Sequence, residues 1–260
     1  MRIWRERQSS GAILALGIGR GPAKMARMTL ILHYAPDNAS LIVRLALEEL
    51  ALPYRTRLVD RAARAQEGRA YRALNPHGLI PTLETPQGPI FETAAILLWL
   101  DGRAPGRLGP PPDAPGRGDF LKWLIFIANT LHPALRMTFY PEKYCPDDGH
   151  PGAEAALRHH MRGQILRHLA QIEAVATGPF FAGDAPTCID VYLAPLLRWC
   201  ALYPRGDTAW FDTGAFPALM QLCRALEARP AIRRACTSEG MDQRPFSAPL
   251  TPRPPEGSAT

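Results

Sequence analysis

The chain has 260 residues, of which 47% are hydrophobic and 21% are charged, a balance typical of a soluble globular protein of one or two domains. The formal net charge is +6, and residues 1–27 contribute +5 of it and residues 244–260 contribute +1, so the body between them is neutral. A neutral body gives no support for nucleic-acid binding, and no apolar run reaches the roughly 18 residues of a membrane span.

Residues 1–27 are expected to form an N-terminal extension, either disordered or wrongly assigned as a start. They combine a basic beginning with a short, glycine-broken apolar run, which superficially resembles a secretory signal. Because Met25 and Met28 follow closely, we favour an upstream start codon, with the working chain beginning near Met28, over a targeting role. The five Cys form no CxxC pair and no zinc ligand set, which indicates free thiols in a reducing, cytoplasmic compartment and no metal site.

Strands and helices alternate in the first part of the body. The expected elements are a strand at 29–34, a helix at 41–50, a strand at 53–60, a weaker helix at 62–73, strands at 79–83 and 89–91, and a helix after Thr93. Asn38 or Ser40 can cap the first helix. Pro81 stands inside a predicted strand, although proline cannot donate a ladder hydrogen bond and belongs at a strand's first residue, an edge or a bulge.

The second part of the body is expected to be helical. Residues 104–118 are dense in Pro and Gly and indicate a linker between two domains. The expected helices lie at 120–136, 153–177, 187–202, 217–228 and 230–236. Residues 244–260 are rich in Pro, Ser and Gly, so we expect them to form a disordered tail.

A small βαβ–α–ββα domain, a proline at its third strand and a following all-helical domain together resemble the glutathione S-transferase superfamily, in its bacterial cytosolic form. The matching motifs are Tyr34-x-Pro36 with Ser40, Asn75-Pro76-x-Gly78, Ile80-Pro81, Phe91-Glu92-Thr93-x-Ala95-Ile96, Gly183-Asp184 and Thr187-x-x-Asp190. The resemblance implies an α/β thioredoxin-like domain at 28–103 and an all-α substrate domain at 119–243, assembled as a homodimer.

The resemblance also implies how glutathione would bind. Pro81 would be cis, and Ile80 would offer its backbone N–H and C=O to the peptide, as one added rung of a sheet. Glu92 and Thr93 would hold the γ-glutamyl end, because a helix N-terminus attracts its carboxylate and Glu92 attracts its ammonium. The alternative for this pair is simple helix capping. His77 would meet the glycine carboxylate when protonated, or be an exposed turn histidine.

Three residues after the first strand are candidates for stabilising the glutathione thiolate. Ala39 stands where the beta class has a Cys, so neither a covalent Cys mechanism nor a thiol-transferring activity is favoured. Ser40, at the start of the first helix, is the first choice, followed by Asn38 and then Tyr34. For each of them, an ordinary capping or packing role is the alternative.

The helical domain would line a pocket for the electrophile. Its candidate residues recur at spacings of three to four and are Trp123, Phe126, Asn129, His132, Arg136 and Tyr140, with core packing as the alternative. Thr187 and Asp190 form the pattern of a capping box and are assigned to folding.

The expected function is the conjugation of the glutathione thiolate to a small electrophile, with glutathione as co-substrate. Two alternatives remain open. One is a non-catalytic binding protein of the same fold, and the other is a specialised glutathione-dependent lyase, dehalogenase or isomerase.

Overall fold

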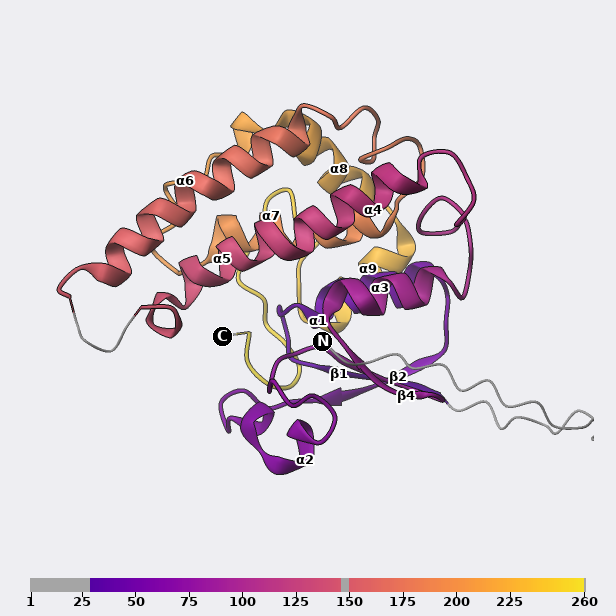
Figure 1. The fold of residues 1–260 in the computed structure, drawn as a ribbon, viewed down its shortest axis with the longest axis horizontal. Coiled ribbons are helices and arrows are strands. Elements are labelled where there is room, and N and C mark those ends of the chain that lie inside the picture. The colour runs from indigo at the N-terminus through magenta and orange to yellow at the C-terminus, as the bar shows by residue number, and fades with distance from the viewer. Residues whose placement is uncertain (1–28, 146–149, 260) are drawn as a thin grey trace, which may run out of the picture.

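The computed structural model describes residues 29–145 and 150–259 and shows a small sheet domain beneath a larger helical one (Figure 1). The extension predicted at residues 1–27 lies outside the described residues. All five Cys are free thiols. Four of them are buried, and Cys145 is partly exposed. Within the described ranges, no helix is both long and apolar enough to cross a membrane.

The first domain is a four-stranded sheet with helices on both faces. Its elements are β1 (Leu30–Tyr34), α1 (Ser40–Glu49), β2 (Tyr54–Leu58), the 3-10 turn η1 (Ala65–Glu67), α2 (Arg69–Arg72), β3 (Thr82–Thr85), β4 (Gly88–Phe91) and α3 (Thr93–Asp101). The strand order is β2-β1-β3-β4, with β1 and β2 parallel and the other pairs antiparallel. Helices α1 and α3 cover one face and α2 lies across the other (Figure 1). The thioredoxin-like fold is therefore confirmed.

Local chemistry explains three differences from the expected elements. The helix predicted at 62–73 is only two short turns, because Gly68 is extended between them, with φ −68° and ψ 151°. The third strand starts at Thr82, after the cis Ile80-Pro81 bond, so Pro81 precedes the ladder. Neither Asn38 nor Ser40 caps α1, since the N-cap position is Ala39 and no side chain bonds there.

The second domain is all-helical, as expected. Its elements are α4 (Arg117–Phe126), the π-helical turn η2 (Ile127–Leu131), α5 (His132–Phe139), the 3-10 turn η3 (Pro141–Lys143), α6 (Ala153–Glu173), α7 (Cys188–Leu202), the 3-10 turn η4 (Thr213–Ala215), α8 (Pro217–Glu227) and α9 (Pro230–Ser238). Helices α4 and α5 run on as one rod through the π turn (Figure 1). Pro133 explains that turn, because it lacks the N–H that the Asn129 carbonyl would bond in a regular α-helix.

Helix α7 is buried along most of its length and begins at the predicted capping box. Thr187 Oγ1 accepts the Ile189 N–H at 3.2 Å, and Asp190 accepts the Thr187 N–H at 2.7 Å and its hydroxyl at 2.8 Å. Asp190 also accepts the Phe181 N–H at 2.7 Å, which ties the preceding loop to the helix. The folding role assigned to this motif is confirmed.

The expectation of a disordered tail is wrong for residues 244–259. The Glu227 carboxylate accepts the N–H groups of Phe246 and Ser247 at 2.7 and 2.6 Å, and the Arg198 guanidinium donates to the Pro245 carbonyl at 2.8 Å. The tail, yellow in Figure 1, descends from the helical domain to the thioredoxin-like domain. Buried side chains thus order a proline-rich segment whose composition alone indicates disorder.

Candidate active site at the domain boundary

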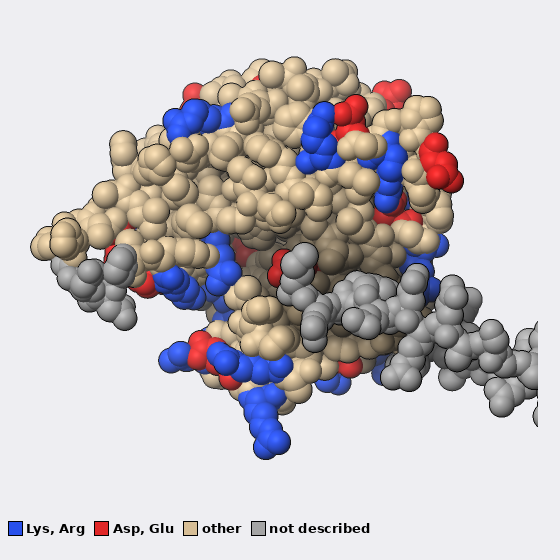
Figure 2. All heavy atoms as spheres, viewed as in Figure 1, with Lys and Arg blue, Asp and Glu red and all other residues tan. Residues whose placement is uncertain are grey.

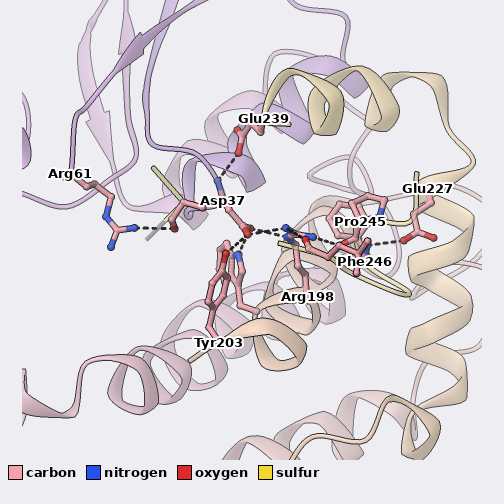
Figure 3. A network of polar contacts seen from close by, with 11 residues as sticks. Asp37, Arg61, Arg198, Tyr203, Glu227, Glu239, Pro245 and Phe246 are labelled. Atoms are coloured by element: carbon pink, nitrogen blue, oxygen red, sulfur yellow. Dashed lines mark hydrogen bonds and ion pairs between the residues drawn. The ribbon is translucent and has the colours of Figure 1, made fainter. Parts of the chain in front are cut away.

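The loop between β1 and α1 is anchored on the helical domain by one buried carboxylate. Asp37, whose φ of 48° lies in the left-handed region, accepts hydrogen bonds at 2.7–2.9 Å from Arg198, Trp199 and Tyr203 (Figure 3). The Arg198 side chain is fully buried, so the bidentate pair with Asp37 is shielded from solvent. This pair fixes the position of the loop that contains Asn38 and joins Tyr34, the last residue of β1, to Ser40, the first residue of α1.

Ser40, the first residue of α1, is buried against this loop. Its side chain is 0% exposed, its hydroxyl donates to the Ala35 carbonyl at 3.0 Å, and its oxygen accepts the Ala35 N–H at 3.2 Å. Both hydrogen-bonding functions of the hydroxyl therefore close the turn onto α1. The hydroxyl of Ser40 is thus already engaged by the backbone of Ala35.

We expect Ser40→Ala to lower the free energy of unfolding by about 1–3 kcal/mol, because both backbone groups of Ala35 then lose a buried partner. Urea denaturation, together with steady-state kinetics, measures this. Unchanged stability combined with a large fall in turnover would instead return Ser40 to the role of thiolate stabiliser.

Asn38 and Tyr34 keep polar groups near the domain boundary. Asn38 is partly exposed, and its buried Oδ1 atom has no hydrogen-bond partner among the described residues. The Tyr34 side chain is buried at the end of β1, with the Arg44 guanidinium 4.5 Å from its ring centroid. Its hydroxyl donates to the Glu256 carboxylate of the tail. Burial and this carboxylate raise the pKa of Tyr34 well above its ordinary value, so the phenol stays protonated.

The segment before β3 presents a short stretch of free backbone. The Leu79 carbonyl accepts the Tyr71 hydroxyl and the Asn75 amide, each at 2.7 Å, and these bonds hold the segment in place. In the part of the chain that the structure describes, no hydrogen bond is made by the N–H or C=O of Ile80. These two groups are therefore free to pair with an extended peptide.

Glu92 and Thr93 open α3 without capping it. Glu92 is exposed with φ 71°, and within residues 29–145 and 150–259 no side chain bonds the N-terminal N–H groups of α3. The alternative of simple helix capping is therefore not what the structure shows for Glu92. Free N–H groups with a partial positive charge, beside an exposed carboxylate, can hold a ligand that has a carboxylate and an ammonium close together.

His77 contacts the end of β4, which leads directly into this helix N-terminus. Its exposed ring packs edge-on against Phe91, with centroids 5.6 Å apart, and Phe91 directly precedes Glu92. Phe91 in turn lies opposite Thr82, the residue after Pro81. The structure thus brings together all five residues predicted to bind glutathione, namely His77, Ile80, Pro81, Glu92 and Thr93.

Comparison with known proteins identifies the family. The sequence profile of the glutathione S-transferase N-terminal domain matches residues 38–103, and that of the C-terminal domain matches residues 154–225. A maleylacetoacetate isomerase of Rhizobium meliloti is 30% identical over 81% of this chain and 97% of its own. The chain belongs to the glutathione S-transferase superfamily.

Two further relatives of this transferase agree with that membership. Glutathione S-transferase GST-4.5 of Xanthomonas campestris is 28% identical over 81% of this chain and 99% of its own. A sphingomonad glutathione S-transferase, solved in complex with glutathione, is 27% identical with a TM-score of 0.66, covering 81% of this chain and 98% of its own. The expected family, fold and general class of enzyme are therefore confirmed.

The six residues predicted to line the transferase's electrophile pocket separate into two groups. Trp123 packs edge-on against Phe126 and Phe181, and Phe126 packs against His168 of α6, with centroids 5.4–5.8 Å apart. These contacts lie within the helical domain, so they favour the alternative that Trp123 and Phe126 are core-packing residues. Asn129 is exposed on the π turn.

The other three residues, His132, Arg136 and Tyr140, follow one another at i, i+4 and i+8 along α5 and the residue directly after it. His132 Nδ1 lies 3.0 Å from the Tyr192 hydroxyl, and burial lowers the pKa of His132 to about 4, with Arg136 adding to the effect, so the imidazole is neutral. The Tyr140 hydroxyl accepts a hydrogen bond from Arg61 of the sheet domain at 2.8 Å. This side of α5 therefore faces the domain boundary, where the molecular surface is hollowed (Figure 2).

Several residues that form contacts at the domain boundary were not predicted from the sequence. Arg61 joins Tyr140 to the tail, since it also donates to the Ala259 carbonyl at 3.4 Å. Glu239 accepts the Asp37 N–H at 2.9 Å and pairs with Arg44 at 2.8 Å. Among residues 29–145 and 150–259, no three His, Cys, Asp or Glu side chains group as metal ligands would.

Proposed function

We propose that this transferase binds glutathione at the N-terminus of α3 and transfers its thiolate to a small electrophile. The observation that supports this most directly is the uncapped start of α3, where free N–H groups stand beside the exposed Glu92 carboxylate. The γ-glutamyl end of glutathione carries a carboxylate and an ammonium on one carbon and fits this pair of groups. The free backbone groups of Ile80 would hold the cysteinyl residue, with its sulfur toward the loop after β1.

The reaction needs the thiol as thiolate, because the thiolate is the nucleophile and a free thiol has a pKa of about 8.5. The thiol gives its proton to solvent, and the sulfur electron pair forms the new carbon–sulfur bond. The electrophile's leaving group, or its double bond, takes up the displaced pair. A hydroxyl or amide that donates to the sulfur favours the ionised form. Since Ser40 is committed to Ala35, we propose Tyr34 and Asn38 as the donors.

Calorimetric titration of reduced glutathione into the full chain tests the binding site. We expect a dissociation constant between micromolar and low millimolar, weakened about 10-fold to 100-fold in Glu92→Ala, because a charge-assisted contact contributes about 1.5–3 kcal/mol. Asp113→Ala is the matched control, since Asp113 is an exposed carboxylate in the linker. Equal affinity in Glu92→Ala and the control would place glutathione elsewhere.

A glutathione-dependent isomerase is the second candidate function. The 30% identity to a maleylacetoacetate isomerase favours it, and conjugation and isomerisation would share the same thiolate. Assays of both reactions on one preparation separate the two candidates, and glutathione binding without either reaction would indicate the non-catalytic alternative. The predicted homodimer stays a prediction, which light scattering of the purified chain would test.

A further inference from the structure

The tail is held in two parts of unequal strength. In its first part, Arg198 donates to the carbonyls of Pro245 and Leu250 at 2.8 and 3.0 Å, and Glu227 bonds three donor groups of Phe246 and Ser247. Arg198 and Glu227 are both buried. This first part is therefore a fixed element of the helical domain (Figure 3).

The second part, residues 254–259, lies against the loop and strand ends that surround Tyr34. A Cβ atom added at Gly257 would lie 2.8 Å from the Leu58 side chain and 3.2 Å from the Pro36 ring, so the tail backbone touches both residues. Glu256 accepts the Tyr34 hydroxyl, although Glu256 itself is exposed. The Ala259 carbonyl accepts a 3.4 Å hydrogen bond from Arg61, and the Ala259 side chain is buried.

The contact between Glu256 and Tyr34 has a direct chemical consequence. A phenol has one hydroxyl proton and donates one strong hydrogen bond at a time. While Tyr34 donates to Glu256, it cannot donate to a thiolate. A carboxylate beside the sulfur would also disfavour ionisation of the thiol, because like charges within a few ångströms oppose one another.

We propose that residues 254–259 are an intramolecular plug, whose Glu256 competes with the sulfur of bound glutathione for the hydrogen bond from the Tyr34 hydroxyl. This inference rests on the proposed function, since Tyr34 must be a donor to the glutathione sulfur. Arg253 is the boundary of the plug, because its N–H donates to the Gly240 carbonyl at 2.8 Å and the residues before it belong to the fixed part. The plug lowers the activity of the enzyme and makes it depend on the state of the tail.

Two variants test the plug, and both keep the buried first part of the tail. One ends the chain after Arg253, and the other is Glu256→Gln, which removes the charge alone. We expect each to raise the fraction of bound glutathione that is ionised at pH 7, read from thiolate absorbance, and to raise kcat/KM by about tenfold. Asp242→Asn is the control, because it removes an exposed carboxylate just before the tail and is expected to match the unchanged chain.

Tyr34→Phe, made in the full chain and in the shortened chain, shows whether the gain passes through Tyr34. We expect it to lower kcat/KM in both chains and to remove the difference between them, so that shortening the chain no longer raises kcat/KM. Unchanged or reduced kcat/KM in both tail variants, or a gain that survives Tyr34→Phe, would overturn the plug. Calorimetry separates the plug from the proposed function. If glutathione binds the full chain and the shortened chain, and its thiolate fraction is equal in both, only the plug is contradicted. Absence of binding to either chain contradicts the proposed function as well.

Discussion

Asp37→Ala is expected to lower the free energy of unfolding by about 3–5 kcal/mol, because it leaves the Arg198 guanidinium buried without its counter-charge. Trp199 and Tyr203 lose an acceptor in the same step. Urea denaturation followed by tryptophan fluorescence and by circular dichroism measures the change. Asp113→Ala, at an exposed linker position, is the control and is expected to stay within about 0.5 kcal/mol of the unchanged chain.

A double variant distinguishes a broken ion pair from general damage to the loop. Asp37→Ala combined with Arg198→Met removes both charges, so we expect it to be more stable than Asp37→Ala alone. If the two effects simply add, the charge pairing is not the source of the loss. The first part of the tail should loosen in the double variant, since Arg198 also donates to Pro245 and Leu250.

The same network supports the candidate active site. Asp37 lies three residues after Tyr34, and its N–H is accepted by Glu239, which pairs with Arg44. The Arg44 guanidinium in turn covers the Tyr34 ring. Loss of the Asp37 carboxylate loosens the loop that follows Tyr34 from the helical domain, so we expect Asp37→Ala to lower turnover even at temperatures where the variant remains folded.

The residues proposed to bind glutathione could be singled out because they form short sequence motifs. Ile80-Pro81 and Glu92-Thr93 each depend on neighbours in the chain, namely a strand start and a helix start, and these features follow from local chemistry. The capping box at Thr187 is predictable for the same reason. A motif cannot reveal whether its hydroxyl is already hydrogen-bonded to a neighbouring residue. The Ser40 hydroxyl, for example, bonds the backbone of Ala35.

The boundary network could not be predicted, because its partners are far apart in the sequence. Asp37 and Arg198 are separated by 161 positions, and an Asp in a turn has an ordinary local explanation. The tail shows the same limit, since only the buried Arg198 and Glu227 order a composition that indicates disorder. Periodicity also fails across a π turn, because one extra residue rotates the following helix by about 100°. Trp123 and His132 consequently face different neighbours.

Asp190→Ala is expected to destabilise the protein by about 2–4 kcal/mol, since two buried N–H groups, those of Phe181 and Thr187, then lose their acceptor. Loss of the capping contact to the start of α7 adds to this cost. Urea denaturation of Asp190→Ala beside Asp212→Ala, which removes the similar cap of the short η4 turn at an exposed site, measures the difference. Equal losses of unfolding free energy in the two variants would show that burial of the Asp190 contacts adds nothing to stability.

The pH dependence of that loss gives an independent check on the burial of Asp190. Burial raises the pKa of Asp190 to about 6, above the roughly 3.9 of an Asp in an unfolded chain. The folded protein then holds a proton more tightly than the unfolded chain, so the stability linked to this proton is fully present below about pH 4 and is lost as the pH rises through about 6. We therefore expect the difference between the unchanged chain and Asp190→Ala to shrink from pH 4.5 to pH 7.5. A difference that grows over this interval would mean that the hydrogen bonds from Phe181 and Thr187 outweigh desolvation and hold the pKa below its ordinary value.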